Sequence, residues 1–154
     1  MCSIFILCCS NSVPKELTLY VNVELPKIVA KEVAIGKSYE SVTGPNYRND
    51  ATTLSTLRND VIPKYKDFIT DLQTISTRLK TSELRELHKI YIDAANTQYS
   101  GFMLVVSGLE KQDGSILSQA NENLHKSHKL MREWLIELQT LCEQNGVTLI
   151  PPTI

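Results

Sequence analysis

The chain has 154 residues, 42% hydrophobic and 21% charged, which is enough for one domain with a hydrophobic core and argues against disorder. Its 16 basic and 17 acidic residues leave it nearly neutral without a cationic block, which argues against a nucleic-acid-binding surface. Six glycines and six prolines are too unevenly placed for the regular turns of a β-sandwich or barrel.

The first dozen residues combine an apolar run with cysteines, in the order Met-Cys-Ser-Ile-Phe-Ile-Leu-Cys-Cys-Ser-Asn-Ser. An apolar run that meets a cysteine and continues into small polar residues resembles the end of a bacterial lipoprotein signal. The resemblance implies Cys9 or Cys8 as the lipidated residue, and a lipid-anchored, extracytoplasmic protein. The run is shorter than the usual signal core of roughly 7–15 residues, and no basic residue precedes it. S-acylation at these cysteines, or an unmodified tail on a cytoplasmic protein, are the alternatives.

Residues 13–42 carry two periodicities. From Leu17 to Leu25 apolar and polar residues alternate, which is typical of a strand, yet an apolar stripe with helical spacing also runs through the whole segment. A lone strand would need a partner, and only residues 147–150 could supply one. We therefore favour one long helix, bent at Pro26 and ended by the glycine and proline of residues 43–46.

The second predicted helix has the clearest pattern in the chain. Apolar or aromatic residues recur there every three or four positions, at Leu54, Leu57, Val61, Tyr65, Phe68, Leu72, Ile75 and Leu79. This spacing predicts a long amphipathic helix on which the other helices pack. Asn49 or Asp50 would cap it, and Pro63 would bend it without breaking it.

Two further helices are predicted, over residues 82–112 and from the Asp113-Gly114-Ser115 turn to Asn145-Gly146. Thr81 or Ser82 would cap the first of them. Short connections predict antiparallel neighbours, so we expect an all-α, up-down-up-down four-helix bundle over residues 13–146, preceded by the anchor-like segment 1–12 and followed by a tail, 147–154. No apolar run is long enough to span a membrane.

The sequence lacks the usual signatures of catalysis and metal binding. It contains no GxxxxGK[ST], GxGxxG, GxSxG or HExxH motif, and no Cys/His spacing of a zinc site. A single Glu122-x-x-His125 is not enough for a di-iron bundle, which needs two such motifs. His88 is expected on the surface. We therefore predict a protein that is not an enzyme and has no cofactor or metal.

One set of residues could form a site. Each predicted helix carries a polar group within its apolar stripe near mid-length: Glu32, Tyr65, Gln98, and Ser127 with His128. Antiparallel packing would bring these to similar heights in a buried polar layer. The favoured interpretation is a hydrogen-bonded layer that sets helix register, and the alternative is a pocket for a small ligand or metal.

Small residues recur every seven positions on the third helix, at Ala94, Gly101 and Gly108. Glycine inside a helix costs about 1 kcal/mol relative to alanine, so a packing reason is expected. Close approach of a neighbouring helix is favoured over a groove for a flat cofactor or lipid chain. Cys142, near the end of the fourth helix, is expected to be buried as a small hydrophobic residue.

These observations predict a non-enzymatic, extracytoplasmic lipoprotein-type bundle that binds a protein partner or small ligand. It would contact the membrane through its N-terminal lipid and would not bind nucleic acid. Two alternatives are a cofactor- or metal-binding bundle that uses the polar layer, and a soluble intracellular helical interaction module.

Overall fold

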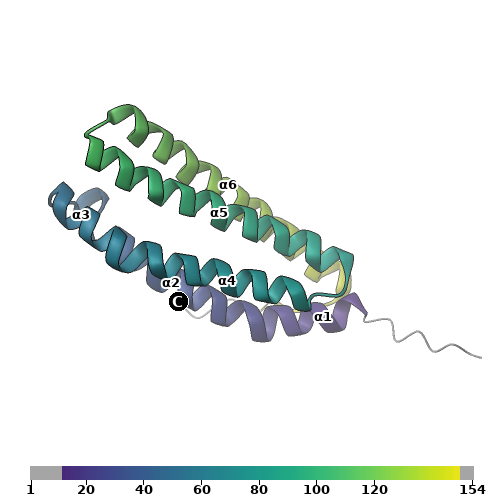
Figure 1. Ribbon diagram of the computed structural model, residues 1–154. Coiled ribbons are helices and arrows are strands. Elements are labelled where there is room, and N and C mark those ends of the chain that lie inside the picture. Colours follow the sequence, from purple (N-terminus) through teal and green to yellow (C-terminus); the bar gives the residue numbers. More distant parts are fainter. Residues whose placement is uncertain (1–11, 150–154) are drawn as a thin grey trace, which may run out of the picture.

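A computed structural model describes residues 12–149, and all regular structure within them is helical (Figure 1). The first long helix comprises α1 (Val13–Leu19), η1 (Tyr20–Glu24) and α2 (Leu25–Glu40). The second comprises α3 (Asp50–Thr56), η3 (Leu57–Val61) and α4 (Ile62–Arg78), and a short turn, η2 (Gly44–Asn46), precedes it. The third and fourth are α5 (Ser82–Lys111) and α6 (Gly114–Asn145). The alternation from Leu17 to Leu25 therefore does not mark a strand. Cys8 and Cys9 lie outside the described residues.

The first two long helices each contain a π-helical turn, η1 and η3, just ahead of a proline. The residue before each proline donates its backbone N–H to the carbonyl five residues earlier, Leu25 to Tyr20 and Ile62 to Leu57. A proline inside an α-helix has no N–H to donate, and its ring clashes with the carbonyl four residues back. The widened turn accommodates the ring, so both helices continue past their prolines.

Side chains cap the starts of α3 and α6. Asn49 accepts a hydrogen bond from the backbone N–H of Thr52 at 2.8 Å, and Asp113 caps α6 in the same manner. The start of α5 differs from expectation, because Thr81 makes no capping hydrogen bond. Instead the Glu16 carboxylate, from α1, accepts the backbone N–H groups of Lys80 at 2.6 Å and of Thr81 at 2.9 Å. A side chain distant in sequence thus satisfies the N–H of the N-cap residue and that of the residue before it.

Helices α5 and α6 lie side by side along their lengths (Figure 1). The glycines of α5 make this possible. A Cβ atom on Gly101 would lie 2.8 Å from Leu124 Cδ2, and one on Gly108 would lie 2.7 Å from Leu117 Cδ2. The prediction of close helix approach is confirmed.

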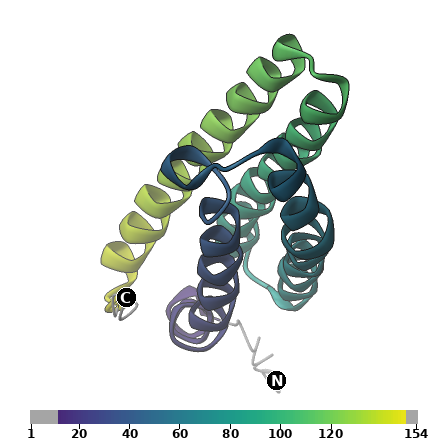
Figure 2. The same cartoon turned by 90° about the vertical axis from the view of Figure 1, so that its left-hand side faces the viewer.

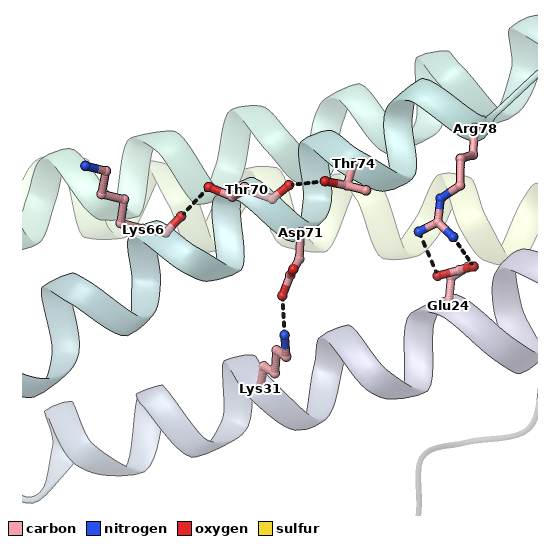
Figure 3. Close-up of polar contacts among 7 residues, drawn as sticks. All are labelled: Glu24, Lys31, Lys66, Thr70, Asp71, Thr74 and Arg78. Carbon is pink, nitrogen blue, oxygen red and sulfur yellow. Dashed lines mark hydrogen bonds and ion pairs between the residues drawn. The ribbon is translucent and has the colours of Figure 1, made fainter.

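Helix α2 packs beside α4, and two ion pairs join them across their exposed face (Figure 3). Lys31 pairs with Asp71, and Arg78 places its two terminal nitrogens 3.2 and 3.4 Å from the carboxylate oxygens of Glu24, which ends η1. Exposed pairs of this kind each contribute at most about 1 kcal/mol. They nevertheless show that the first long helix and α4 are in contact on this side of the molecule.

The predicted stripe of the second helix forms the centre of the core. Its members from Leu57 to Ile75 are buried, and the two end members are partly buried. The ring of Tyr65 meets Phe102 of α5 edge-on at a centroid distance of 5.2 Å, and Cys142 is buried as expected. None of the helices within residues 12–149 is both long and apolar enough to cross a membrane.

Candidate ligand-binding groove

The side of the molecule between α2 and α6 is open. Figure 2 shows α2 with α4 on one side and α6 on the other. Helix α2 packs against α4 but makes few contacts with α6, which meets the first long helix mainly at α1. Leu135, on the apolar side of α6, is therefore 53% exposed.

A groove of about 440 Å³ lies at this opening. Its volume falls within the range of about 300–1,000 Å³ that is usual for small-molecule sites. One wall comes from η1 and α2, and the other comes from α6. Tyr91 of α5 and Leu149 of the tail complete the groove. The residues of the two walls are Val21, Leu25, Pro26, Val29 and Glu32 on the first, and Met131, Trp134, Leu135 and Leu138 on the second. Spacings of three and four residues place each wall's members on one helix face.

Glu32 is the one charged residue that lines the groove. The hydroxyl of Tyr91 donates a hydrogen bond to its Oε2 atom at 2.6 Å. Burial raises the pKa of the Glu32 carboxyl, and the hydrogen bond from Tyr91 opposes this shift only in part. Burial, and then the nearby charge of Glu32, raises the pKa of the Tyr91 hydroxyl, which stays protonated as the donor.

Trp134 lies against Tyr91 in the same groove, with ring centroids 4.5 Å apart. It is the only tryptophan of the chain and is 5% exposed. Its indole Nε1 is buried beside the hydroxyl of Tyr20, whose pKa burial raises and this contact lowers in part, although the two atoms do not form a hydrogen bond of good geometry. Trp134 therefore contributes its aromatic ring to the groove wall.

The residues of the predicted polar layer do not share one hydrogen-bonded network. Glu32 bonds to Tyr91 instead of to a layer member, and Tyr65 is buried nearby with its hydroxyl unpaired among the described residues. Ser127 donates to the carbonyl of Ala94 at 2.9 Å and lies 3.3 Å from Gln98 Oε1, within the α5–α6 interface. His128 is exposed, because it lies one position beyond the buried face of α6, and it therefore belongs to no buried layer.

The expectation that His88 lies on the surface is wrong, because the structure buries it completely. Its Nε2 lies 2.8 Å from the carbonyl oxygen of Leu72, and its Nδ1 lies 2.8 Å from the hydroxyl of Tyr20. A carbonyl only accepts, so Nε2 carries the proton and Nδ1 accepts from Tyr20. Burial lowers the pKa of this imidazole. The sequence did contain a signal, since His88 follows Leu84 by four positions and precedes Tyr91 by three, on the buried face of α5.

A second hollow, of about 220 Å³, lies beside α1 and the C-terminal end of α4. Its carboxylates already have partners: Glu24 pairs with Arg78, and Glu16 accepts the N–H groups of Lys80 and Thr81. The groove between α2 and α6 differs because its carboxyl has no cationic partner among the residues that line it.

The groove is suited to holding a molecule. Within residues 12–149 no group of three or more His, Cys, Asp or Glu side chains could hold a metal ion. The groove offers apolar walls, one carboxyl with one phenol already hydrogen-bonded to it, and the ring of Trp134. Comparison of the chain with family models, with curated proteins and with solved structures found no match.

Proposed function

We propose that this protein is a non-enzymatic binding protein whose groove between α2 and α6 holds a small apolar molecule with one polar end. The observation that carries the proposal is the uncovered apolar groove of about 440 Å³ with a single carboxyl, that of Glu32, in its wall. Apolar walls supply affinity, and the few polar groups orient the molecule.

We also infer that the four helices alternate in direction, as an antiparallel up-down-up-down bundle with one side left open. The short connections around residues 79–81 and 112–113 support this arrangement, as does the capping of α5 by Glu16. In a closed bundle α2 would cover the apolar side of α6. Here a ligand would take that place and remove Leu135 from water.

The resemblance of residues 1–12 to a lipoprotein signal supports an extracytoplasmic site of action with a lipid at Cys9 or Cys8. Fractionation and intact-mass measurement of natively expressed protein test this part separately. A diacylglyceryl-modified mass in the membrane fraction is expected, and an unmodified chain that remains in the soluble fraction would contradict it.

Ligand binding is testable through the fluorescence of Trp134, because it is the only tryptophan and lines the groove. Titration with 1-decanol, a neutral molecule with an apolar chain, is expected to change the emission saturably. Val29→Phe should weaken this binding by filling the groove, since Val29 lines it. Val33→Phe is the matched control, because Val33 lies one turn on in α2, is 46% exposed and does not line the groove.

The proposal fails if decanol produces no saturable change in emission. It also fails if Val29→Phe and Val33→Phe, both shown to be folded by circular dichroism, bind decanol equally well.

A further inference from the structure

We infer that the molecule held in the groove carries an ammonium group, which pairs with Glu32 while its apolar chain lies between α2 and α6. The inference rests on the proposed function and names its ligand class: a primary alkylammonium compound.

The first support is the missing counter-ion of Glu32. No basic residue lines the groove. Two basic side chains are engaged on another face of the first long helix, where Lys31 pairs with Asp71 and Arg78 with Glu24 (Figure 3). A carboxylate held out of water without a cation is unfavourable, and a cationic ligand would remove that penalty.

The second support is the hydrogen bonding of the carboxyl. Tyr91 donates to Oε2, and no other group of residues 12–149 donates to Glu32. Oε1 is therefore open to a donor. An ammonium nitrogen has three N–H donors and no acceptor, so it can bond to Oε1 without competing with the Tyr91 hydroxyl.

The third support is the aromatic pair beside the carboxyl. Tyr91 and Trp134, whose ring centroids are 4.5 Å apart, both line the groove. A cation within about 6 Å of an aromatic ring is attracted by its electron-rich face, most strongly for tryptophan. A carboxylate ligand would gain nothing from the rings and would be repelled by ionised Glu32.

The titratable groups around Glu32 predict how binding depends on pH. They are Tyr91 of α5 and Tyr65 of α4, which both stay protonated, and no titratable residue of α6 lines the groove. Burial raises the pKa of Glu32, whereas an ammonium beside it would lower that pKa. Ammonium binding should therefore release a proton at acidic pH and strengthen as the pH rises, whereas binding of a neutral alcohol should not.

The test compares three ligands of equal chain length by Trp134 fluorescence, below their micelle concentrations: decylammonium, 1-decanol and decanoate. At pH 8 decylammonium is expected to bind at least about tenfold more tightly than decanol, the advantage of one charge-assisted contact. Glu32→Gln should abolish this advantage, because it weakens decylammonium binding far more than decanol binding. Glu40→Gln, an exposed change on the same helix outside the groove, should retain the preference.

The inference is overturned if decanol or decanoate binds the unmodified protein as tightly as decylammonium, or if Glu32→Gln keeps the preference for the cation. Either result leaves the groove as a binding site for apolar molecules. If none of the three ligands binds, the proposed function itself fails.

Discussion

Replacing Gly108 by alanine is expected to destabilise the protein, whereas the same change at Gly36 should stabilise it. An added Cβ atom at Gly108 would lie 2.7 Å from Cδ2, 2.8 Å from Cγ and 3.1 Å from the backbone nitrogen of Leu117. The Leu117 side chain can rotate, but its backbone starts α6 and is held by the Asp113 cap. The new methyl group must therefore push the two helices apart locally.

The cost of overpacking and the gain in helix propensity together decide whether each substitution lowers or raises the free energy of unfolding. Overpacking of this kind costs about 1–3 kcal/mol, and exchanging glycine for alanine inside a helix returns about 1 kcal/mol. For Gly108→Ala we expect a net loss of about 1 kcal/mol in the free energy of unfolding. At Gly36, in α2, no atom lies within 4 Å of the added Cβ, so the gain of about 1 kcal/mol should appear undiminished.

Urea unfolding and thermal unfolding, both followed by circular dichroism, compare the two variants with the unmodified protein. The melting temperature should move by about 2–4 °C per kcal/mol for a chain of this size, downward for Gly108→Ala and upward for Gly36→Ala. Equal stabilisation by the two substitutions would refute the close contact between α5 and α6.

Three further changes test other parts of the structure. Glu16→Ala should lower the free energy of unfolding by about 1–2 kcal/mol and speed hydrogen exchange at the Lys80 and Thr81 amides, because their acceptor is removed. Stability should fall as pH drops below about 6.5, because burial lowers the pKa of folded His88 and the unfolded chain binds the proton first; His88→Gln should flatten this dependence. The contribution of Glu32 depends on pH in the opposite direction. Burial raises its pKa in the folded protein, so the ligand-free protein loses stability as the pH rises through that pKa. Glu32→Gln should therefore be more stable than the unmodified protein at pH 8.

Each of these three predictions has an outcome that would contradict it. Glu40→Ala, which removes an exposed carboxyl with no capping role, is the control for Glu16→Ala, and equal effects would argue against the cap. The role of His88 is refuted if His88→Gln shows the same loss of urea midpoint between pH 7.5 and 5.5 as the unmodified protein. If Glu32→Gln is less stable than the unmodified protein at pH 8, other groups of the folded protein must stabilise the ionised Glu32 carboxylate.

Local features of the fold were predictable because they depend on residues close in sequence. The stripe from Leu57 to Ile75 follows the helical repeat, and Asn49 and Asp113 are good capping residues. The alternation between Leu17 and Leu25 matched a strand only because polar residues fall between apolar ones that also share a helix face. The π-turn before each proline was missed because it depends on how the helix relieves the ring clash.

The groove could not be predicted, because it results from two helices that fail to meet. Met131 and Leu138 have the spacing of ordinary core residues, and nothing in α6 alone tells which helix covers them. Glu32 was noticed as an interruption in an apolar stripe, but its partner, Tyr91, comes from a helix 59 residues further along. Trp134 likewise has core spacing and is buried, whereas its place beside Tyr91 depends on how α5 and α6 pack.

The most direct test of the groove is a nitrogen–proton correlation spectrum recorded during titration with decylammonium at pH 8. One indole N–H signal is expected, that of Trp134, because the chain has one tryptophan. The account predicts that this signal shifts saturably together with the backbone amides of residues 21–32 and 131–138, and that the shifts at the same ligand concentration are much smaller in Glu32→Gln. An unmoved indole signal, or saturable shifts confined to other surfaces, would contradict it.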